Sequence, residues 1–234
     1  MKLYELAYAC RLYASFTDFD ISLKEFYRIT NPALDLSNQV HGKALLVWLN
    51  SWGCRQFAKD YHSVAIKELA DWSRHHRNQL PREGLGLVEV SDVALDAAAE
   101  AYGDLKGRKA SMRHRNSQEH AVTFGPTGAA KVFYALRPNI FPPWDDPIRE
   151  HFGYDGSSGS YRKFLAMVKE QISCLVEEAA SFGIKTVDIP MSIGRSEASL
   201  PKLVDEYFWV TITSQCAPPS GEEIMQWARW AGCR

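Results

Sequence analysis

The chain has 234 residues, of which 46% are hydrophobic and 12% are aromatic. This length and composition are enough to bury a real core, which predicts one globular domain or two small lobes. The formal net charge of −1 excludes a polycation that binds nucleic acid through overall charge, so any such binding must come from a local basic patch.

Targeting segments and metal motifs are not expected. No stretch reaches the roughly 18 to 20 uninterrupted apolar residues of a membrane span, and the first residues include Glu5 and Arg11 where a signal peptide would be apolar. We therefore expect a cytoplasmic protein with no membrane partner. The five cysteines are odd in number and lack a C-x-x-C pair, so we expect reduced thiols, no metal and no cofactor.

Helical periodicity dominates the chain. Apolar stripes with the spacing of one helix face occur over residues 3–16, 43–52, 64–76, 91–107, 161–180, 200–208 and 220–232. The fourth begins with Ser91 or Asp92 as a plausible cap, and the last opens with Ser220 as a cap. Strand patterns are limited to residues 86–90 and 210–213, and the second could equally be the end of a helix. The sequence predicts an all-α or nearly all-α fold over residues 1–234, as one helical domain or as two lobes with a cleft near residues 120–150.

A basic run, RKASMRHR, occupies residues 108–115 and follows Gly103 and Gly107. Its cations Arg108, Lys109, Arg113 and Arg115 are not interrupted by any acid. The pattern indicates a basic loop, which is either an ordinary solvated surface or a contact to the phosphates of nucleic acid.

Two glycines precede another apolar helix, predicted over residues 129–136. Gly125 and Gly128 form a tight turn that exposes backbone N–H groups at a helix start, which is a ready site for an anion. Glycines of this kind are also typical of a plain helix start. The segment does not match a phosphate-binding Walker loop, because Lys131 comes three residues after Gly128 and is followed by Val132.

Two aspartates stand in the segment FPPWDDPIREHF, residues 141–152. Pro147 suits the first position of a helix, which makes Asp146 the expected N-cap. Asp145 comes one residue earlier, near the positive end of the helix dipole, where a carboxylate tends to stay ionised. Asp145 is therefore either a solvated turn residue or a functional acid.

Taken in chain order, these parts resemble the helix-hairpin-helix DNA glycosylase superfamily. The resemblance rests on the glycine turn, the helix ending in Ala-Leu, the loop through Pro142-Pro143-Trp144, and Asp145 followed by Ile148 and Phe152. It implies a two-lobed helical fold, DNA as the partner, Asp145 as the catalytic residue and Asp146 as a helix cap or secondary acid. It also implies phosphate contacts from the turn and the basic run, that is from Gly125, Thr127, Gly128, Lys131, Arg108, Lys109, Arg113 and Arg115.

The sequence departs from the family pattern in three places. The usual hairpin reads Leu-Pro-Gly-Val-Gly, whereas the glycines here are spaced differently. The position of the attacking lysine in bifunctional members is occupied by Pro126, which favours simple hydrolysis over lyase chemistry. The iron-sulfur cysteine loop of some members is missing. The chain resembles an outlying branch, for which an unusual modified base, including one from phage DNA, is a reasonable substrate.

The chemistry expected of Asp145 is the stabilisation of charge. Breaking an N-glycosidic bond builds positive charge on the sugar, and at about 4 Å and an effective dielectric near 20 a carboxylate stabilises it by about 4 kcal/mol. The target base must first be flipped out of the duplex, and Trp144, Trp52 and Tyr154 are candidates to form its pocket. We therefore expect the Asp145 carboxylate to face a pocket large enough for an extruded base.

Two other functions fit the same residues. The chain could be a non-catalytic DNA-binding or interaction protein on the same helical scaffold. It could also be a small-molecule hydrolase in which residues 125–128 receive a nucleotide phosphate. A serine or cysteine hydrolase is disfavoured because the sequence has no G-x-S-x-G elbow.

Overall fold

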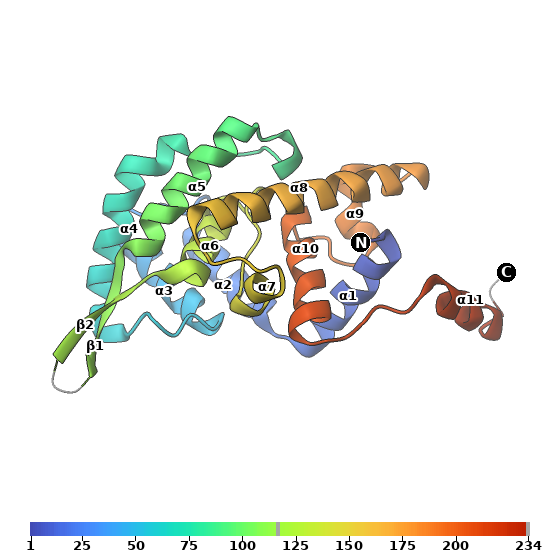
Figure 1. Ribbon diagram of the computed structural model, residues 1–234, viewed down its shortest axis with the longest axis horizontal. Coiled ribbons are helices and arrows are strands. Elements are labelled where there is room, and N and C mark those ends of the chain that lie inside the picture. Colours follow the sequence, from blue (N-terminus) through green and yellow to red (C-terminus); the bar gives the residue numbers. More distant parts are fainter. Residues whose placement is uncertain (116–117, 233–234) are drawn as a thin grey trace.

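The computed structural model describes residues 1–115 and 118–232, and it confirms an all-α fold with one small sheet (Figure 1). The helices are α1 (Leu3–Phe16), α2 (Phe19–Thr30), α3 (Gln39–Ser51), α4 (His62–His76), α5 (Asp92–Gly107), α6 (Gly125–Leu136), α7 (Asp146–His151), α8 (Ser158–Ser181), α9 (Ile189–Ser192), α10 (Leu200–Phe208) and α11 (Gly221–Trp230). The strands β1 (Lys109–Arg115) and β2 (Gln118–Thr123) pair antiparallel as a hairpin.

Several helix starts lie where side-chain caps were predicted. The Ser91 hydroxyl accepts a hydrogen bond from the Ala94 N–H and starts α5. At α11, Ser220 and Glu223 form a reciprocal capping box. Such caps satisfy N–H groups that have no partner within the helix, typically contributing about 1 kcal/mol each. The helix α2, which was not predicted, begins at Phe19 without a side-chain cap.

Both strand predictions were wrong. Residues Leu87–Glu89 form a single 3-10 turn, and Trp209–Thr213 form a π-helical turn that continues α10, so the alternative of a helix end is confirmed there. Of the two strands, β1 coincides with the predicted basic loop, and β2 follows it in the chain. There, Ala110 and Ser111 are buried, and the Ser111 hydroxyl donates to the Gln56 carbonyl at 2.7 Å, which fixes the base of the hairpin to the body.

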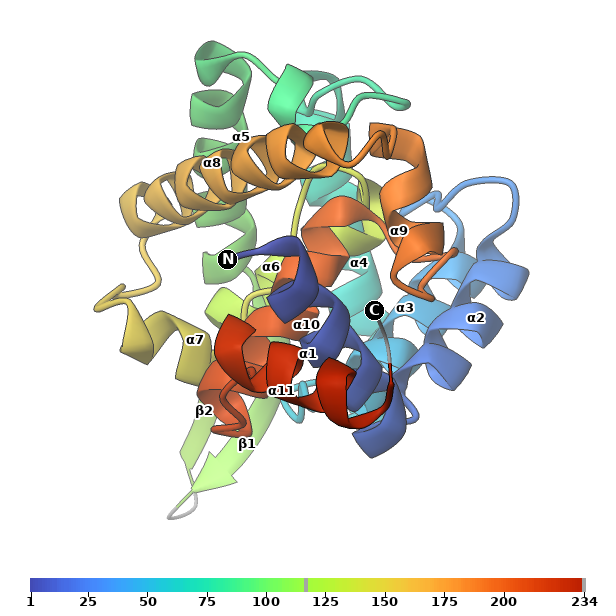
Figure 2. The same ribbon diagram turned by 90° about the vertical axis from the view of Figure 1, so that its right-hand side faces the viewer.

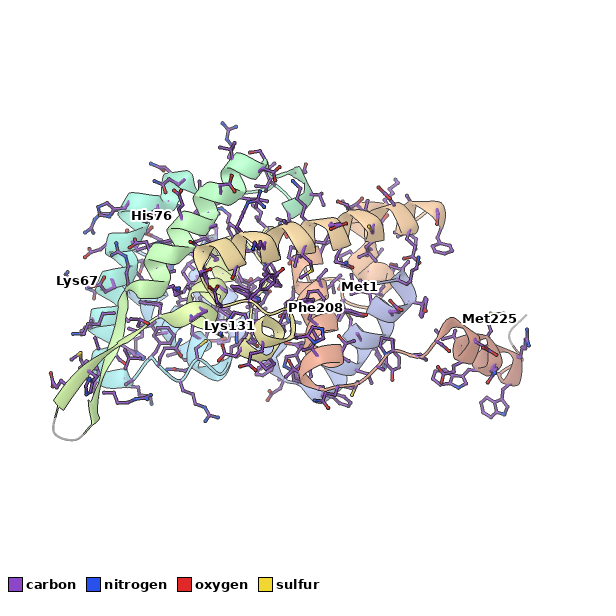
Figure 3. All side chains as sticks on the ribbon, in the orientation of Figure 1. Met1, Lys67, His76, Lys131, Phe208 and Met225 are labelled. Atoms are coloured by element: carbon purple, nitrogen blue, oxygen red, sulfur yellow. The ribbon has the colours of Figure 1, made fainter. Side chains whose placement is uncertain are left out.

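The main core gathers around α6 and α10, whose side chains are buried on nearly every side. The long helix α8 packs across α5 and also against α10 (Figures 1 and 2). A helix buried on all sides places its charged residues inside the protein as well as its apolar ones, and such residues must find partners there. This holds for Lys131 of α6, which Figure 3 shows within the body of the molecule.

The helix α11 is the exception to this packing. It lies beyond one end of the molecule and buries none of its residues (Figures 1 and 3). Among the described residues, no helix combines the length and the apolar character needed to cross a membrane.

Candidate active site

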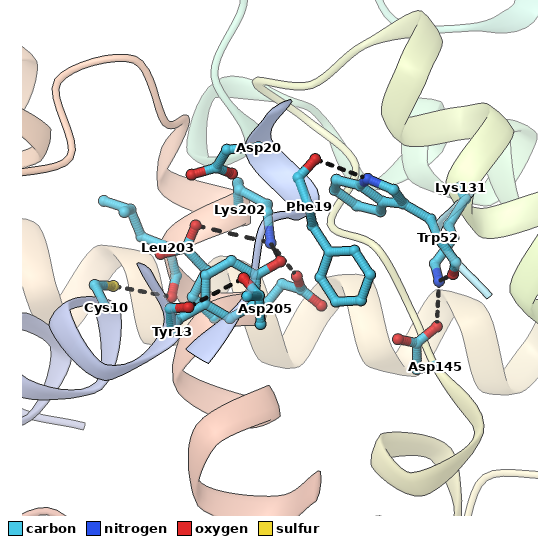
Figure 4. Close-up of polar contacts among 12 residues, drawn as sticks. Cys10, Tyr13, Phe19, Asp20, Trp52, Lys131, Asp145, Lys202, Leu203 and Asp205 are labelled. Carbon is cyan, nitrogen blue, oxygen red and sulfur yellow. Dashed lines mark hydrogen bonds and ion pairs between the residues drawn. The ribbon is translucent and has the colours of Figure 1, made fainter. Parts of the chain in front are cut away.

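The Asp145 carboxylate faces a buried lysine instead of capping the helix that follows it. The residue occupies the cap position of α7 with an extended backbone, but its side chain makes no cap hydrogen bond. Its Oδ1 lies 2.7 Å from Nζ of Lys131 (Figure 4). The carboxylate is 28% exposed, so it is held from the inside of the protein while its other side remains accessible.

Asp146 is not the cap that the sequence predicted. It is the first residue of α7, with Pro147 second, because a proline is tolerated throughout the first turn, where backbone N–H groups have no helical partner. Its carboxylate accepts a hydrogen bond from the Thr127 hydroxyl at 2.9 Å and pairs with Arg149. Asp146 therefore joins α7 to the first turn of α6 at the surface.

Lys131 is buried, and its ammonium group contacts Asp145 and Trp52. Besides Asp145, it donates to the Trp52 carbonyl at 2.6 Å and lies 5.7 Å from the Trp52 ring centroid. Burial by itself lowers the pKa of Lys131, but the Asp145 carboxylate and the nearby Cys54 raise it, and the net pKa lies above its ordinary value. Lys131 thus stays protonated, and it lies inside the fold rather than on the surface where the predicted phosphate contact would be made.

The Asp145 carboxylate lies beside a cavity, but this cavity is much smaller than the base pocket that the sequence analysis predicted. The cavity measures about 40 Å³ and is lined by Tyr13, Phe19, Trp52, Lys131, Pro143, Asp145, Asp205 and Trp209. A water molecule in the liquid takes about 30 Å³, whereas ligand pockets usually measure about 300–1,000 Å³. In this arrangement the cavity has room for a group the size of water, and a nucleobase could enter only after its walls had moved.

A second lysine–aspartate pair lies on α10, and its aspartate, Asp205, also lines this cavity (Figure 4). Nζ of Lys202 lies 2.7 Å from Oδ2 of Asp205 and donates to the Tyr13 hydroxyl at 3.1 Å. Both members of the pair are buried. Burial raises the pKa of Asp205 to about 6, the Lys202 charge opposes this, and the charge of Asp145 adds to it.

The ion pairs extend from this second pair toward α2. The Arg195 guanidinium contacts the fully buried Glu206 at 3.0 Å and Asp20 at 2.7 Å. Sequence reasoning missed this network. A lysine followed three and four residues later by acids is the usual pattern of an exposed helix face, and only the packing of α10 against α1 and α8 turns that face inward.

The predicted basic run lies on the hairpin. Arg108 is occupied by ion pairs to Asp104 at 3.0 Å and Glu68 at 3.3 Å. On β1, Lys109 is half-buried and Arg113 is exposed. Arg115 also belongs to β1, but its side chain lies outside the described part of the chain, as do residues 116 and 117. Among the predicted cations whose side chains the structure describes on this hairpin, Arg113 is therefore the exposed one.

The glycine turn has a packing explanation at one of its two glycines. Gly125 begins α6 with φ of +66°, a conformation that strongly favours glycine. Gly128 is buried, and a Cβ there would approach Nε2 of Gln56 to 2.7 Å and the Phe57 ring to 3.3 Å. The backbone of Gly128 thus faces other residues of the core, whereas Thr127 is half-buried and engaged by Asp146 and Arg149.

Of the three aromatic residues predicted to form a base pocket, one lines the cavity. Trp52 does so, and its indole stacks on Tyr134 with the centroids 5.9 Å apart. Trp144 is fully buried and stacks on Phe164 at 4.9 Å, which makes it a residue of the core. Tyr154 packs edge-on against Trp144 at 5.9 Å and does not reach the cavity.

No protein-family model, curated protein or solved structure matches the chain. The likeness to helix-hairpin-helix glycosylases therefore rests on residues 125–152 alone.

Proposed function

We propose that the protein is a monofunctional DNA glycosylase that hydrolyses the N-glycosidic bond of a damaged or modified base and leaves an abasic site. The observation that carries the proposal is the placement of Asp145. Its carboxylate is turned away from the helix start that would have used it as a cap, and it is fixed at the edge of a cavity by a buried, protonated lysine.

In this proposal Asp145 acts on the sugar as the base departs. Its carboxylate stabilises the positive charge that builds on the deoxyribose and orients a water molecule, which adds to the sugar carbon while the base leaves with a proton. Lys131 has a positioning role, since its ion pair with Asp145 fixes the rotamer of that side chain. A fixed carboxylate needs little reorganisation at the moment of reaction, which is what makes such a group effective.

The charge of Lys131 supports hydrolysis over lyase chemistry. An amine attacks the sugar only when it is unprotonated, and enzymes obtain that state by lowering the pKa of the lysine. Here the neighbouring carboxylate raises that pKa. Borohydride should therefore trap no covalent complex between the protein and a DNA substrate.

The size of the cavity favours a second candidate, a DNA-binding protein without catalysis. About 40 Å³ does not hold a base, and entry would require the aromatic walls formed by Phe19 and Trp209 to move. In the proposed enzyme this movement accompanies base flipping. In a non-catalytic protein the cavity would stay closed. Such a protein would bind DNA without excising any base, and Asp145→Asn would leave that binding unchanged.

One experiment separates the two candidates. Purified protein is incubated with DNA duplexes that carry a panel of damaged or modified bases, phage-type modifications included, and alkali then cuts any abasic sites. We expect cleavage of at least one duplex, lost in Asp145→Asn and kept in the matched variant Asp146→Asn. If no duplex is cut, or if Asp145→Asn is as active as the wild type, the enzyme proposal fails.

A further inference from the structure

The helix α11 presents large apolar side chains that nothing in the described part of the chain covers. Trp227 and Trp230 are 57% and 91% exposed, and Met225 is also exposed. Single exposed apolar residues are common on protein surfaces, but Trp227 and Trp230 are three residues apart on one helix, so the two indoles share a face and form a patch of the kind that mediates association. Its capping box indicates that this segment is built to be a helix and is not a frayed tail.

The same chain has an apolar groove of about 320 Å³ between α2 and α3. Its walls include Phe26, Ile29, Val40, Ala44, Val47 and Trp48. Val40 and Val47 are 63% and 53% exposed, so the groove is open in the described residues. An open groove between two helices is a common receptor for the apolar face of a third helix.

We propose that α11 of one copy docks into the α2–α3 groove of a second copy, and that the exchange is reciprocal. Figures 1 and 2 place α11 beyond one end of the molecule, away from the α2–α3 face, so an arm of this kind reaches outward to a neighbour. Exchange of an identical element between two copies closes on itself and gives a two-fold dimer. This inference is independent of the proposed glycosylase activity.

The charges of α11 and of the α2–α3 groove are complementary, which favours this groove as the site where α11 binds. In the first turn of α11, Glu223 is engaged in the capping box and Glu222 is the acid left for a partner, while an exposed lysine, Lys43, lines the groove. On the other wall, Glu25 is already paired with Arg28 at 2.8 Å. The acidic first turn also disfavours an anionic membrane surface, which attracts helices with a basic polar face.

The contact area is sufficient for a stable dimer. An aromatic side chain buries about 150–250 Å², and Trp227 and Trp230 are 57% and 91% exposed, so the four tryptophans of two α11 helices would contribute on the order of 450–750 Å². The groove walls and the other apolar residues of α11 add to this figure. A specific interface needs about 1,200–2,000 Å² in total, which two reciprocal helix–groove contacts can reach.

Molar mass in solution tests the proposal, with light scattering on the full chain. We expect a dimer for the wild type and monomers for Val47→Glu in the groove and Trp227→Glu on α11. The matched control is Val93→Glu, an exposed valine on α5 outside the groove, which should remain dimeric. Thermal unfolding of each variant establishes that loss of the dimer is not loss of the fold. A monomeric wild type, with α11 free or folded back on its own groove, overturns the proposal.

Mixing the two monomeric variants identifies the receptor. Val47→Glu keeps an intact α11 and Trp227→Glu keeps an intact groove, so the mixture should form a heterodimer through one helix–groove contact. Lys43→Glu should weaken the wild-type dimer about fivefold, and Glu222→Lys added to it should restore the affinity. Dimerisation of Val47→Glu alone would mean that α11 pairs with another α11, and the inference would then be wrong. Because the heterodimer keeps only one of the two contacts, it should form more weakly than the wild-type dimer, and a mixture that stays monomeric even at concentrations far above those at which the wild type dimerises also contradicts the inference.

Discussion

Two lysine–aspartate pairs each place a carboxylate at the same cavity, and they differ in how much of that carboxylate is exposed. Each pair has a contact of 2.7 Å between Nζ and a carboxylate oxygen. The side chain of Asp145 is 28% exposed, whereas that of Asp205 is 7% exposed and that of its partner Lys202 is 2% exposed. The first pair can therefore act on a molecule that reaches the cavity, and the second is enclosed.

The contrast shows what each lysine does. Lys131 is anchored to the Trp52 carbonyl and holds an accessible acid in one orientation. Lys202 balances Asp205 and lies 3.7 Å from Glu206, so it neutralises charge inside the core. A buried charge without a partner is costly, while an accessible one is compensated by water. We therefore expect changes at the second pair to affect folding first and changes at the first pair to affect activity first.

The largest effect is expected for Lys202→Met. This change removes the cation between Asp205 and Glu206 and leaves buried carboxylates with less compensation, which should lower the free energy of unfolding by about 3–5 kcal/mol. Urea unfolding measures this. Lys163→Met on α8, where the lysine is exposed, is the control and should change stability by less than about 0.5 kcal/mol. A loss below about 1 kcal/mol for Lys202→Met would show that the enclosed pair is not a structural requirement.

The next effect is on catalysis and is expected for Asp145→Asn. An amide keeps the shape of the side chain but removes its charge, so glycosylase turnover should fall by about 100- to 1,000-fold. Single-turnover cleavage of the best duplex from the panel measures this rate, with stability checked in parallel. Asp146→Asn should retain nearly all of the activity, because its carboxylate faces Thr127 and Arg149 rather than the cavity. Equal losses in the two variants would remove the distinction between the two aspartates.

The two pairs also differ in how far they could be predicted. Caps and periodicity predicted most of the helices, and the argument that Asp145 is not a cap came from Pro147, which was expected to make the intervening Asp146 the cap. The cap itself was off by one residue, and the hairpin was missed because a basic run lacks the alternation of apolar residues that marks a strand. Lys131 was predicted to contact DNA and Lys202 was not singled out, because burial of a lysine depends on helices distant in sequence.

A smaller effect is expected from the titration of Asp205, which should make the free energy of unfolding depend on pH. Burial raises its pKa from 3.8 to about 6, so between these values the folded protein binds more protons at this site than the unfolded chain does. The contribution of Asp205 to stability is thus full below about pH 4 and falls by about 2 kcal/mol as pH rises to about 6. Comparing urea unfolding of the wild type and Asp205→Asn across this range measures it. A difference between the two proteins that does not vary with pH would contradict the assignment.

The smallest effect on the free energy of unfolding is expected at the surface ion pair of Asp146 with Arg149. This exposed pair is the reference against which the two buried lysine–aspartate pairs are compared. Asp146 is 67% exposed, so water screens its charge and the pair should contribute at most about 1 kcal/mol. In Asp146→Ala, Thr127 and Arg149 remain hydrogen-bonded to each other, which limits the loss further. Unfolding of this variant at low and high salt measures the pair, and added salt should reduce its effect. A loss as large as that of Lys202→Met would mean that the link between α6 and α7 holds the site together, and that Asp145 owes its position to this link as much as to Lys131.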